Sequence, residues 1–551
     1  MKTYKYIFAI VLSVICLSSC DDFLDKAPLN LPSTDTFLED EEQIKMAVAG
    51  AHNPLYLQFI GIPFVIYMDN GSDIAAERDA TPENMYCNPN SIQVVWTWEH
   101  CYRGISRCNF IIDNIDRAKE NVSQEKIDRY KAEMRVLRSY YYLVLTDMYG
   151  DVPLIEHNVS LQDSYVARTS KDKVVDFIMK ECKEAVPSLD EKNQPNTMAI
   201  TKGLAYAIMA RTALYNERWQ EAIDNCQAVM SMEGKEYELN PDYASITKLA
   251  GKTSKEIIWA IQYNQDDITH TTPKCFISRM GGGYSNKMPV QALVDSYECT
   301  DGLSIDKSPL YDPKQPWKNR DPRLGYTIAL PGTVFMGYQF ETNKDSTKCW
   351  NYNVTPAVRV DNLDATHTYA SFSGYCWRKY VDEGELRSDG ASSINAIVFR
   401  YAEILLTYAE AKIELNKIDQ TVYNAINKVR KRAGMPNIKP NETQQELRCA
   451  VRKERKYEFA GEGLRLSDIR RWKMADKVLN GICYGRVPTG YPSKAPHIDE
   501  YGNPDYSTFS EKNKFGTKLG MRVFDASKHY LSPLPYVEIQ ANKNLKQNPG
   551  Y

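Results

Sequence analysis

The chain has 551 residues, of which 43% are hydrophobic and 25% are charged, so it is long enough for several domains or one large one. Its 68 basic and 71 acidic residues give a net charge of −3, a balance that excludes a general attraction to nucleic acid. The 37 tyrosines far outnumber the 16 phenylalanines, which favours surfaces that hold a partly polar ligand, although helix packing uses the same residue.

The first residues have the three parts of a secretory signal. Two lysines are followed by an almost wholly apolar run over residues 7–15, and then by two small serines before Cys20. The run is too short to span a bilayer comfortably, and no later stretch of the sequence reaches about 18 apolar residues. We therefore predict that residues 1–19 are a signal peptide.

The stretch "LSSC" that ends at Cys20 resembles the lipobox of bacterial lipoproteins. In proteins of that kind the signal is cut before the cysteine, which is then acylated and becomes the first residue of the mature chain. Stable anchoring needs more than one acyl chain. The resemblance predicts that Cys20 is the lipid anchor and that residues 20–40, which contain two prolines, form a tether.

The remaining cysteines follow no recognisable pattern. Two of the 13 lie in or beside the leader, which leaves an odd number in a large chain. The sequence contains no C-x-x-C pair and no Cys/His cluster of the zinc type. A disulfide framework is therefore not expected, and one or two isolated bridges remain open.

Helical periodicity begins after the tether. Residues 41–50 form a first predicted helix. Apolar and aromatic side chains then recur at steps of four and three over residues 98–121 and again over 127–148, where Gly150 and Pro153 end the pattern. These steps put the side chains on one helix face, so we predict two long amphipathic helices.

Two later segments resemble helical hairpins. Residues 202–230 and 400–436 each carry several alanines on the first helix, a short polar turn and a second periodic run. Small residues let two helices approach closely, as in tetratricopeptide repeats. The two copies are neither adjacent nor regular, so the match is loose.

Three regions lack long periodic stretches and are rich in Gly, Pro, Asn and Tyr. Within them, "SKEIIWAIQY" predicts a strand because Ile257, Trp259 and Ile261 alternate. Long irregular segments in a compact domain are usually functional or disordered, and the aromatic content favours ordered, functional loops. We predict loop-rich regions at residues 55–97, 240–394 and 481–530.

The densest run of charge lies over residues 448–473. Its basic residues alternate with glutamate and aspartate, whereas a nucleic-acid surface would need basic residues without them. We interpret this run as a helix solvated through ion pairs three and four residues apart, followed by a turn at Gly461 and Gly463 and a second helix.

Nothing in the sequence indicates an enzyme or a metal site. The seven histidines are scattered without an H-E-x-x-H motif, and "GGGYSN" lacks the form of a phosphate loop. Carboxylates are plentiful, so a glycosidase pair cannot be recognised by spacing. "DNGSDIAAERD" does not match a calcium loop, so calcium binding has no support, and we predict no cofactor.

Segments along the whole chain resemble, in order, those of the SusD-like (RagB/SusD) outer-membrane lipoproteins of Bacteroidetes. Each segment is weak alone, and together they are specific. They are "CDDFLDKAPLN", "YRGISRCNFIIDNI", "EMRVLRSYYYLVLTDMYGDVPLI", "SKEIIWAIQY", "NRDPRLGYTI", "RYAEILLTYAEAKIEL", "VRKERKYEFAGEGLRLSDIRRWK" and "ANKNLKQNPGY".

The resemblance implies a mostly α-helical fold, in which four tetratricopeptide-like helix pairs form a scaffold and a loop-rich region with short strands binds the ligand. It implies a single domain over residues 41–551, with the scaffold mainly at 41–54, 98–235 and 395–480. It also implies a non-catalytic, lipid-anchored protein on the outer face of the outer membrane. Such proteins bind glycans and associate with a SusC-like TonB-dependent transporter.

Glycan binding needs flat aromatic faces together with hydrogen-bonding groups in a concave site. Trp98, Trp219, Trp259 and Trp472 lie on helical or strand patterns and are expected in the core. The other tryptophans are expected on loops, and Asp73 takes the place of an aspartate common in the family's "S-D" loop. The candidate glycan-binding residues are Asp73, Arg78, Tyr86, Trp96, Tyr284, Trp317, Trp350 and Trp377.

The leading interpretation is a surface lipoprotein that captures oligosaccharide or polysaccharide and passes it to the transporter. The same scaffold could instead carry a non-sugar cargo such as peptides. A surface glycoside hydrolase is a third alternative. The identity of the ligand does not follow from the sequence.

Overall fold

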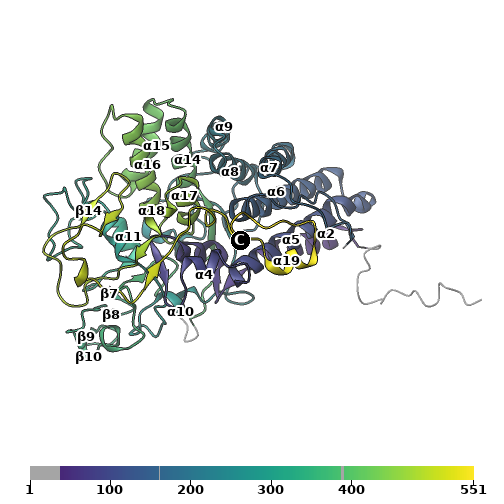
Figure 1. Cartoon of the computed structure of the whole chain (residues 1–551). Coiled ribbons are helices and arrows are strands. Elements are labelled where there is room, and N and C mark those ends of the chain that lie inside the picture. The colour runs from purple at the N-terminus through teal and green to yellow at the C-terminus, as the bar shows by residue number, and fades with distance from the viewer. Residues whose placement is uncertain (1–36, 161, 386–389) are drawn as a thin grey trace, which may run out of the picture.

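The computed structural model describes residues 37–160, 162–385 and 390–551, and it divides into a helical half and a loop-rich half (Figure 1). Successive helices of the helical half pack on one another: α5 on α6, α6 on α7, α7 on α8 and α8 on α9. These helices are α2 (Glu41–His52), α5 (Ile92–Asn114), α6 (Gln124–Tyr149), α7 (Lys171–Ala185), α8 (Lys202–Tyr215) and α9 (Trp219–Met230).

The second half of the scaffold continues the same stack. It consists of α14 (Tyr401–Glu414), α15 (Gln420–Arg432), α16 (Gln444–Phe459) and α17 (Arg465–Arg471). α14 packs on α9 although a long stretch of chain separates them, and both α15 and α16 pack on α14. The two hairpins predicted at residues 202–230 and 400–436 therefore pack together in one stack. The predicted mostly helical fold is confirmed.

Local sequence signals explain where the helices begin and end. The Ser91 side chain accepts a hydrogen bond from the Val94 amide and caps α5, and Thr443 and Glu446 form a capping box on α16. Gly150, at a φ of 75°, ends α6 as predicted. Because the cap at Ser91 starts α5 before Trp98, the end of the loop predicted at residues 55–97 is wrong.

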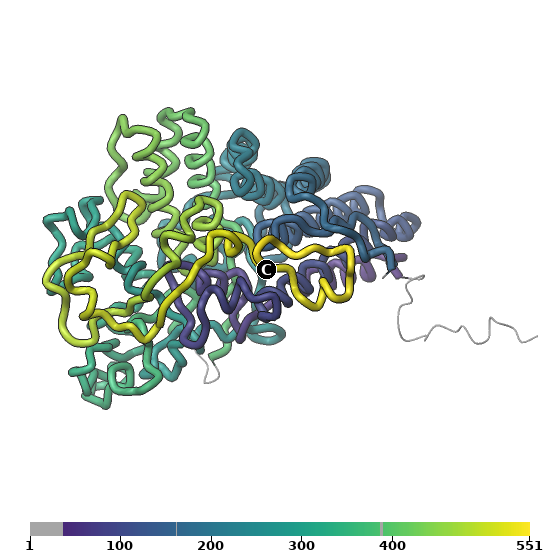
Figure 2. The backbone as a smooth tube through the Cα atoms, viewed as in Figure 1, coloured from purple at the N-terminus to yellow at the C-terminus, as the bar shows by residue number. Residues whose placement is uncertain are grey.

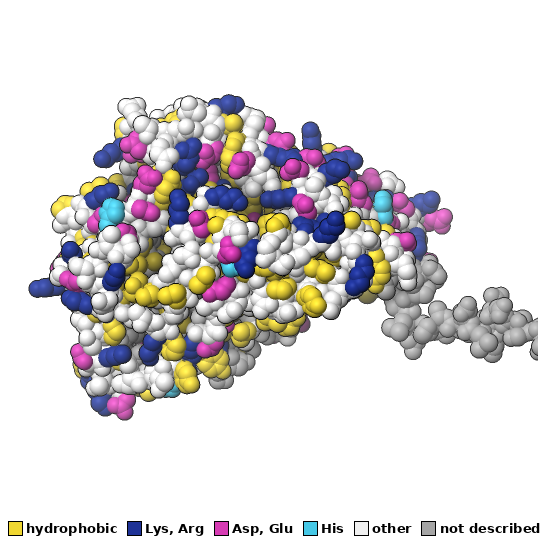
Figure 3. Space-filling view, in the orientation of Figure 1, with side chains coloured by type: hydrophobic (Ala, Val, Ile, Leu, Met, Phe, Trp, Pro, Cys, Tyr) yellow, Lys and Arg dark blue, Asp and Glu magenta, His cyan; other side chains and the backbone are white. Residues whose placement is uncertain are grey.

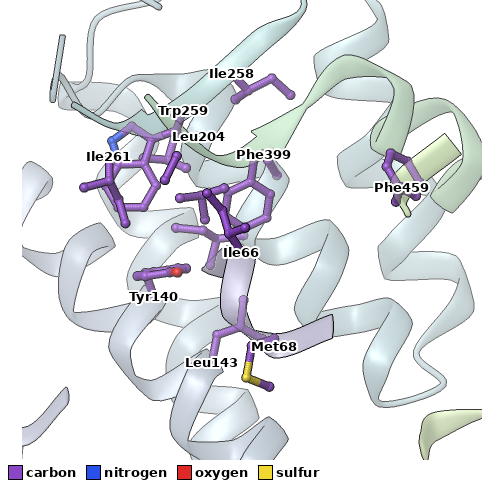
Figure 4. Packing of buried hydrophobic residues seen from close by; sticks show 14 of the residues in the cluster. Ile66, Met68, Tyr140, Leu143, Leu204, Ile258, Trp259, Ile261, Phe399 and Phe459 are labelled. Atoms are coloured by element: carbon purple, nitrogen blue, oxygen red, sulfur yellow. The ribbon is translucent and has the colours of Figure 1, made fainter. Parts of the chain in front are cut away.

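The predicted strand is present and joins the two halves. β4 (Ile257–Ile261) pairs antiparallel with β12 (Ala396–Arg400), which leads directly into α14. All five residues of β4 are buried, so its two faces are both covered. Figure 4 shows side chains of β4 and β12 packing against those of α6 and α8, and the rings of Tyr140 and Trp259 meet edge to face at 5.2 Å.

The predicted core tryptophans lie in this packed interior or at its border. Trp98 and Trp259 are buried. Trp219 and Trp472 are partly buried and pack against the same core. The aliphatic and aromatic side chains of both halves thus form one large cluster.

The loop-rich half is organised by small sheets. The largest has the strand order β10-β9-β8-β7, and the others are antiparallel pairs: β1 with β2, β3 with β5, β6 with β11, β13 with β16, and β14 with β15. The strands are β1 (Gln58–Phe59), β2 (Ile62–Pro63), β3 (Ala75–Glu77), β5 (Lys287–Pro289), β6 (Ile328–Ala329), β7 (Val334–Phe335), β8 (Tyr338–Gln339), β9 (Lys348–Asn351), β10 (Val358–Asp361), β11 (Cys376–Trp377), β13 (Gly481–Ile482), β14 (His497–Ile498), β15 (Pro504–Asp505) and β16 (Met521–Arg522).

Short helices connect these strands. They are α3 (Phe64–Tyr67), α4 (Pro82–Tyr86), α10 (Thr272–Phe276), α11 (Gln291–Ser296), α12 (Pro322–Thr327), α13 (Leu363–Thr366), α18 (Ala475–Val478) and α19 (Tyr536–Ala541). After α18 the chain crosses the loop-rich half and then runs back along the helices to the C-terminus (Figure 2). There the Asn548 amide donates to the carbonyl of Tyr149 at 2.9 Å and covers the end of α6.

The interpretation of residues 448–473 as a solvated helix is wrong. Glu454, Arg455 and Glu458 of α16 are buried. Their partners come from elsewhere in the chain: Arg323 lies 2.6 Å from Glu454, and Arg400 lies 2.6 Å from Glu458. The alternating charges therefore serve a buried ion-pair network, because loop-region cations and α16 carboxylates neutralise one another in the interior.

The distribution of charged side chains on the surface agrees with the nearly balanced net charge of the chain. Acidic and basic side chains are interspersed over the helical half (Figure 3). Within residues 37–160, 162–385 and 390–551, no helix is both long and apolar enough to cross a bilayer, and every cysteine is free. The predicted anchor Cys20 lies outside this part of the chain.

Candidate functional site

Two exposed tyrosines and three basic side chains meet in the loop-rich half. We name this area the Tyr284–Tyr369 surface, and its side chains come from three separate segments of the chain. β3 pairs with β5, which brings the residue after β3 beside the loop before β5, where the Arg78 amide donates to the carbonyl of Asn286 at 2.9 Å. The surface consists of Arg78, Lys274, Arg279, Tyr284, Tyr369 and Phe372.

Arg78 joins the segments of this surface. Its guanidinium donates to the carbonyl oxygens of Tyr284 at 2.6 Å and Tyr369 at 2.8 Å. Its plane also lies over the rings of Tyr369, at 5.5 Å, and Phe372, at 5.1 Å. Burial lowers the pKa of Arg78, and the nearby charge of Arg279 lowers it further. The two cations are thus held close together.

Tyr284 stands out from the surface with its ring between two basic side chains. The ring is 47% exposed. The Lys274 ammonium lies 5.3 Å and the Arg279 guanidinium 5.9 Å from its centre. The Tyr284 amide donates to the carbonyl of Lys274 at 2.7 Å, so a short turn fixes the ring next to α10.

Tyr369 is the second exposed ring, with 55% of its surface accessible. Arg279 donates through Nε to its carbonyl oxygen at 2.8 Å. Asp364 accepts hydrogen bonds from the backbone amides of Arg279 at 2.7 Å and Met280 at 3.2 Å. Burial raises the pKa of Asp364 to about 6 although these hydrogen bonds favour the ionised carboxylate. The carboxyl group therefore holds the loop in place.

Trp350 lies on β9 in the adjacent four-stranded sheet. It is 38% exposed, and the Arg359 guanidinium lies 5.5 Å from its ring. A Cβ atom on Gly281 would stand 2.8 Å from Cγ of Met336, so the turn between β7 and β8 touches the loop that carries Tyr284. Trp350 is therefore a further exposed ring in the sheet that touches this loop, and its predicted place on a loop is wrong.

Asp73 does not face solvent. It is buried and pairs with Arg465 of α17 through both carboxylate oxygens, at 2.8 and 2.9 Å. Burial opposes ionisation of Asp73, but the Arg465 charge outweighs it and lowers the pKa of the carboxyl. We interpret this aspartate as a structural tie between the loop region and the scaffold.

Tyr86 and Trp377 are buried and show no ring face to a ligand. Tyr86 lies on α4, and a Cβ atom on Gly71 would stand 2.4 Å from its ring. Trp377 lies on β11 instead of the predicted loop, and its ring packs 6.1 Å from that of Phe276. Their burial makes the binding role predicted for them incompatible with this structure.

Within the described residues, no ring contact or hydrogen bond joins Trp317 or Trp96 to the Tyr284–Tyr369 surface. Trp317 is on a loop, as predicted, but it is half-buried and meets the ring of Tyr375 edge to face at 5.9 Å. Trp96 lies on α5 and not on a loop. It is 41% exposed and stacks on Phe59 at 6.3 Å, so it forms a separate aromatic position.

The structure thus brings together two of the predicted residues, Arg78 and Tyr284. Sequence reasoning missed Lys274, Arg279 and Tyr369. Tyr369 lies in the predicted loop-rich region 240–394, between the candidates Trp350 and Trp377, and the basic pair lies just before Tyr284. Attention to every aromatic residue in these stretches and to the neighbouring cations would have found them.

A polar cavity of about 600 Å³ lies near β3 and the C-terminal loops, and its lining includes Asp73 and Lys456. Lys456 donates to the carbonyl of Gly502 at 2.9 Å and to Asn503 Oδ1 at 2.8 Å. Burial, together with the nearby charge of Arg465, lowers the pKa of Lys456 to about 7. The side chains of Asp73 and Lys456 in this wall are thus already bonded within the protein.

No group of three or more His, Cys, Asp or Glu side chains able to hold a metal ion occurs in the part of the chain that the structure describes. The Tyr284–Tyr369 surface has the chemistry of a binding site. Its aromatic rings can cover an apolar face of a ligand, and its hydrogen-bond donors can bond oxygen atoms around that face.

The chain matches known proteins over nearly its whole length. SusD-like protein P25 of Formosa agariphila is 25% identical over 88% of this chain and 92% of its own. A SusD-like protein of Bacteroides ovatus is 22% identical over 98% of this chain and 97% of its own. Both relatives are thus similar to this chain from end to end.

Solved structures show the same fold. A SusD-like carbohydrate-binding protein from Bacteroides fragilis superposes with a TM-score of 0.79 at 27% identity, covering 93% of this chain and all of its own. Surface glycan-binding protein A from Bacteroides uniformis superposes with a TM-score of 0.65 at 20% identity, covering 92% of this chain and 99% of its own.

Two family models together cover most of the sequence. The model described as "Starch-binding associating with outer membrane" matches residues 22–214. The model of the SusD family matches residues 255–551, which is more than half of the chain. The chain therefore belongs to the SusD family.

Proposed function

We propose that this protein captures oligosaccharide or polysaccharide at the cell surface and holds it on the Tyr284–Tyr369 surface. SusD-family proteins are non-catalytic binding proteins. The observation that carries the proposal is the pair of exposed rings flanked by hydrogen-bond donors. Sugar rings present C–H faces that cover aromatic rings, and their hydroxyl groups accept hydrogen bonds from arginine and lysine.

The comparisons support the ligand class. The solved relative from Bacteroides fragilis, at 27% identity, is named as a carbohydrate-binding protein. Peptides are the alternative cargo, and the exposed rings of Tyr284 and Tyr369, which suit the C–H face of a sugar ring, favour a glycan.

The ligand class is tested by affinity electrophoresis of the protein without its leader through gels that contain one polysaccharide each, with calorimetry against a peptide panel beside it. We expect retardation by at least one polysaccharide and no heat of binding from peptides. Binding of peptides together with indifference to every polysaccharide would refute the proposed ligand class.

We further propose that the protein is anchored by lipid at Cys20 in the outer membrane and delivers the glycan to a SusC-like TonB-dependent transporter. The lipobox-like "LSSC" sequence supports the anchor, and the family membership supports the transporter. The matching model described as associating with the outer membrane supports the location.

The anchor and the partner can be tested in one experiment on cells. We expect wild-type protein to incorporate labelled palmitate and to co-purify with a TonB-dependent transporter after mild detergent extraction. The Cys20→Ala variant should lose the label and leave the membrane fraction. A Cys20→Ala protein that kept its label would contradict the anchor, and purification of wild type without a transporter would contradict the partner.

A further inference from the structure

We propose that the glycan held on the Tyr284–Tyr369 surface is anionic and carries carboxylate or sulfate groups on its sugars. This inference rests on the proposed glycan binding and narrows it to a class of ligand. It follows from the basic side chains around the two rings, which have almost no acidic partners.

The basic side chains are anchored but not neutralised. Arg78 bonds only carbonyl oxygens, and its buried Nε has no hydrogen-bond partner. Arg279 uses its Nε on the carbonyl of Tyr369, and its two terminal nitrogens bond nothing in the described residues. The Lys274 ammonium donates to the carbonyl of Gly282 at 3.0 Å. None of the three forms an ion pair within the described chain.

A fourth cation borders the surface. The Lys518 ammonium lies 4.9 Å from the ring of Phe372, the same ring that Arg78 covers at 5.1 Å. Lys518 is exposed, and within the described chain it has neither a hydrogen-bond nor an ion-pair partner. Two cations thus share Phe372, while two others flank Tyr284.

Some exposed basic residues elsewhere in this protein have carboxylate partners. In the adjacent sheet, Lys348 lies 2.6 Å from Asp361. On the helical half, Lys126 lies 2.6 Å from Glu41. Exposed lysines elsewhere, such as Lys173, Lys180 and Lys183 of α7, also form no ion pair within the described residues, so the Tyr284–Tyr369 surface is distinguished by having four unpaired cations around its aromatic rings.

Two carboxyl groups lie near these cations. Asp364 is buried, bonds backbone amides and interacts with the charge of Arg279, and Asp79 follows Arg78 in the chain and is exposed. Two carboxylates cannot balance four cations. Arg78 and Arg279 both donate to the carbonyl oxygen of Tyr369, each at 2.8 Å, so their charges lie close together and an anion bound between them would be favoured.

Neutral sugars need hydrogen-bond donors, but they do not need an excess of positive charge. Carboxylates and sulfates accept two parallel hydrogen bonds from a guanidinium, and such charge-assisted bonds are stronger than those to hydroxyl groups. Free terminal nitrogens of Arg279 beside an exposed tyrosine ring suit a sugar that stacks on the ring and turns its anionic group to the arginine.

The test uses affinity electrophoresis against uronate polysaccharides (polygalacturonate, alginate) and sulfated ones (chondroitin sulfate, carrageenan), with carboxyl-reduced or desulfated forms of the same polymers beside them. We expect either the uronate polymers or the sulfated polymers to retard the protein. Removing the anionic group from those polymers should lower the affinity by about 10-fold or more. The two arms distinguish a carboxylate ligand from a sulfate ligand.

The triple variant K274Q/R279Q/K518Q removes three charges from the surface and leaves both rings. We expect it to bind the anionic polymer at least about 10-fold more weakly and with a smaller dependence on salt. The control K173Q/K180Q/K183Q removes three exposed lysines of α7 and should bind like wild type.

Equal binding of the charged and neutralised polymers, or unchanged binding by the triple variant, would overturn the anionic ligand. Binding of a neutral polysaccharide through Tyr284 would support the proposed function and refute only the anionic ligand. Failure to bind any carbohydrate in either arm would refute both the proposed function and the anionic ligand.

Discussion

Replacing Glu458 by glutamine is expected to lower the free energy of unfolding by about 3–5 kcal/mol. The substitution keeps the size of the side chain and removes its charge. In the structure Glu458 is fully buried and bonds three guanidinium groups: Arg400 at 2.6 Å, Arg323 at 3.1 Å, and Arg432. Without the carboxylate these cations would be left in the interior with too few anions, which is the costly arrangement.

The effect should be large because the network joins the two halves of the protein. Arg400, at the end of β12, also bonds Glu256 at 2.7 Å and Glu462 at 2.7 Å. Glu462 in turn lies 2.6 Å from Lys379 of the loop-rich half. Loss of one central carboxylate therefore weakens contacts among segments that are far apart in the sequence.

The pH dependence of this effect has a definite sign. Burial opposes the ionisation of Glu458, but the charges of Arg432, Arg400 and Arg323 outweigh it and hold its pKa below the usual range. A lowered pKa in the folded state stabilises the protein above the unfolded pKa of about 4.3, and this contribution is lost as the pH falls through the folded pKa. The glutamine variant should therefore be destabilised throughout pH 5–8.

Denaturation by guanidinium chloride, followed by circular dichroism, measures the change. The matched control is Glu99→Gln, which breaks the exposed pair between Glu99 and Arg103 and should cost less than about 1 kcal/mol. If the free energy of unfolding of Glu458→Gln lay within about 1 kcal/mol of the wild-type value, the buried network would not hold the two halves of the protein together as described.

Tyr284→Ala and Tyr369→Ala are each expected to weaken glycan binding by about 10-fold or more, because a stacked ring at the centre of a site carries much of the binding energy. Neither ring supports the fold, since they are 47% and 55% exposed. Unfolding of both variants should therefore match wild type, and the loss should be confined to affinity measured by calorimetry.

Tyr536→Ala is the matched control for these variants. Tyr536 lies on α19 and is 50% exposed, so the same substitution removes a similar ring from another part of the surface. Its affinity for the glycan should equal that of wild type. Equal weakening by all three substitutions would point to a general surface effect and would contradict the assigned site.

Much of the scaffold could be predicted because helices carry their own signals. The steps of three and four residues located α6, and Gly150 located its end. The strand at Ile257–Ile261 was recognised from the alternation of Ile257, Trp259 and Ile261. Where a local signal was overlooked, as with the cap at Ser91, the predicted boundary was wrong.

The charged run over α16 could not be interpreted from its own residues. Its pattern of Glu and Arg fits ion pairs along a solvated helix equally well. What decides burial is Arg323 and Arg400, which reach Glu454 and Glu458 from distant segments. Such partners depend on tertiary packing, which no local period encodes.

The candidate site was predictable only in part for the same reason. Arg78 and Tyr284 were selected as single residues, and the pairing of β3 with β5 brings them together. Tyr86 and Trp377 have the same chemistry in the sequence but are buried. Whether an aromatic ring faces solvent or the core depends on what packs over it, and loop sequences do not carry that information.

The central claim is that a glycan is captured on the Tyr284–Tyr369 surface, and one gel tests it directly. Wild type, the double variant Y284A/Y369A and the control Y536A are run together through a gel that contains the polysaccharide found to bind. We predict that wild type and Y536A are retarded and that Y284A/Y369A migrates as in a gel without polysaccharide. Equal retardation of the double variant and wild type would contradict the account.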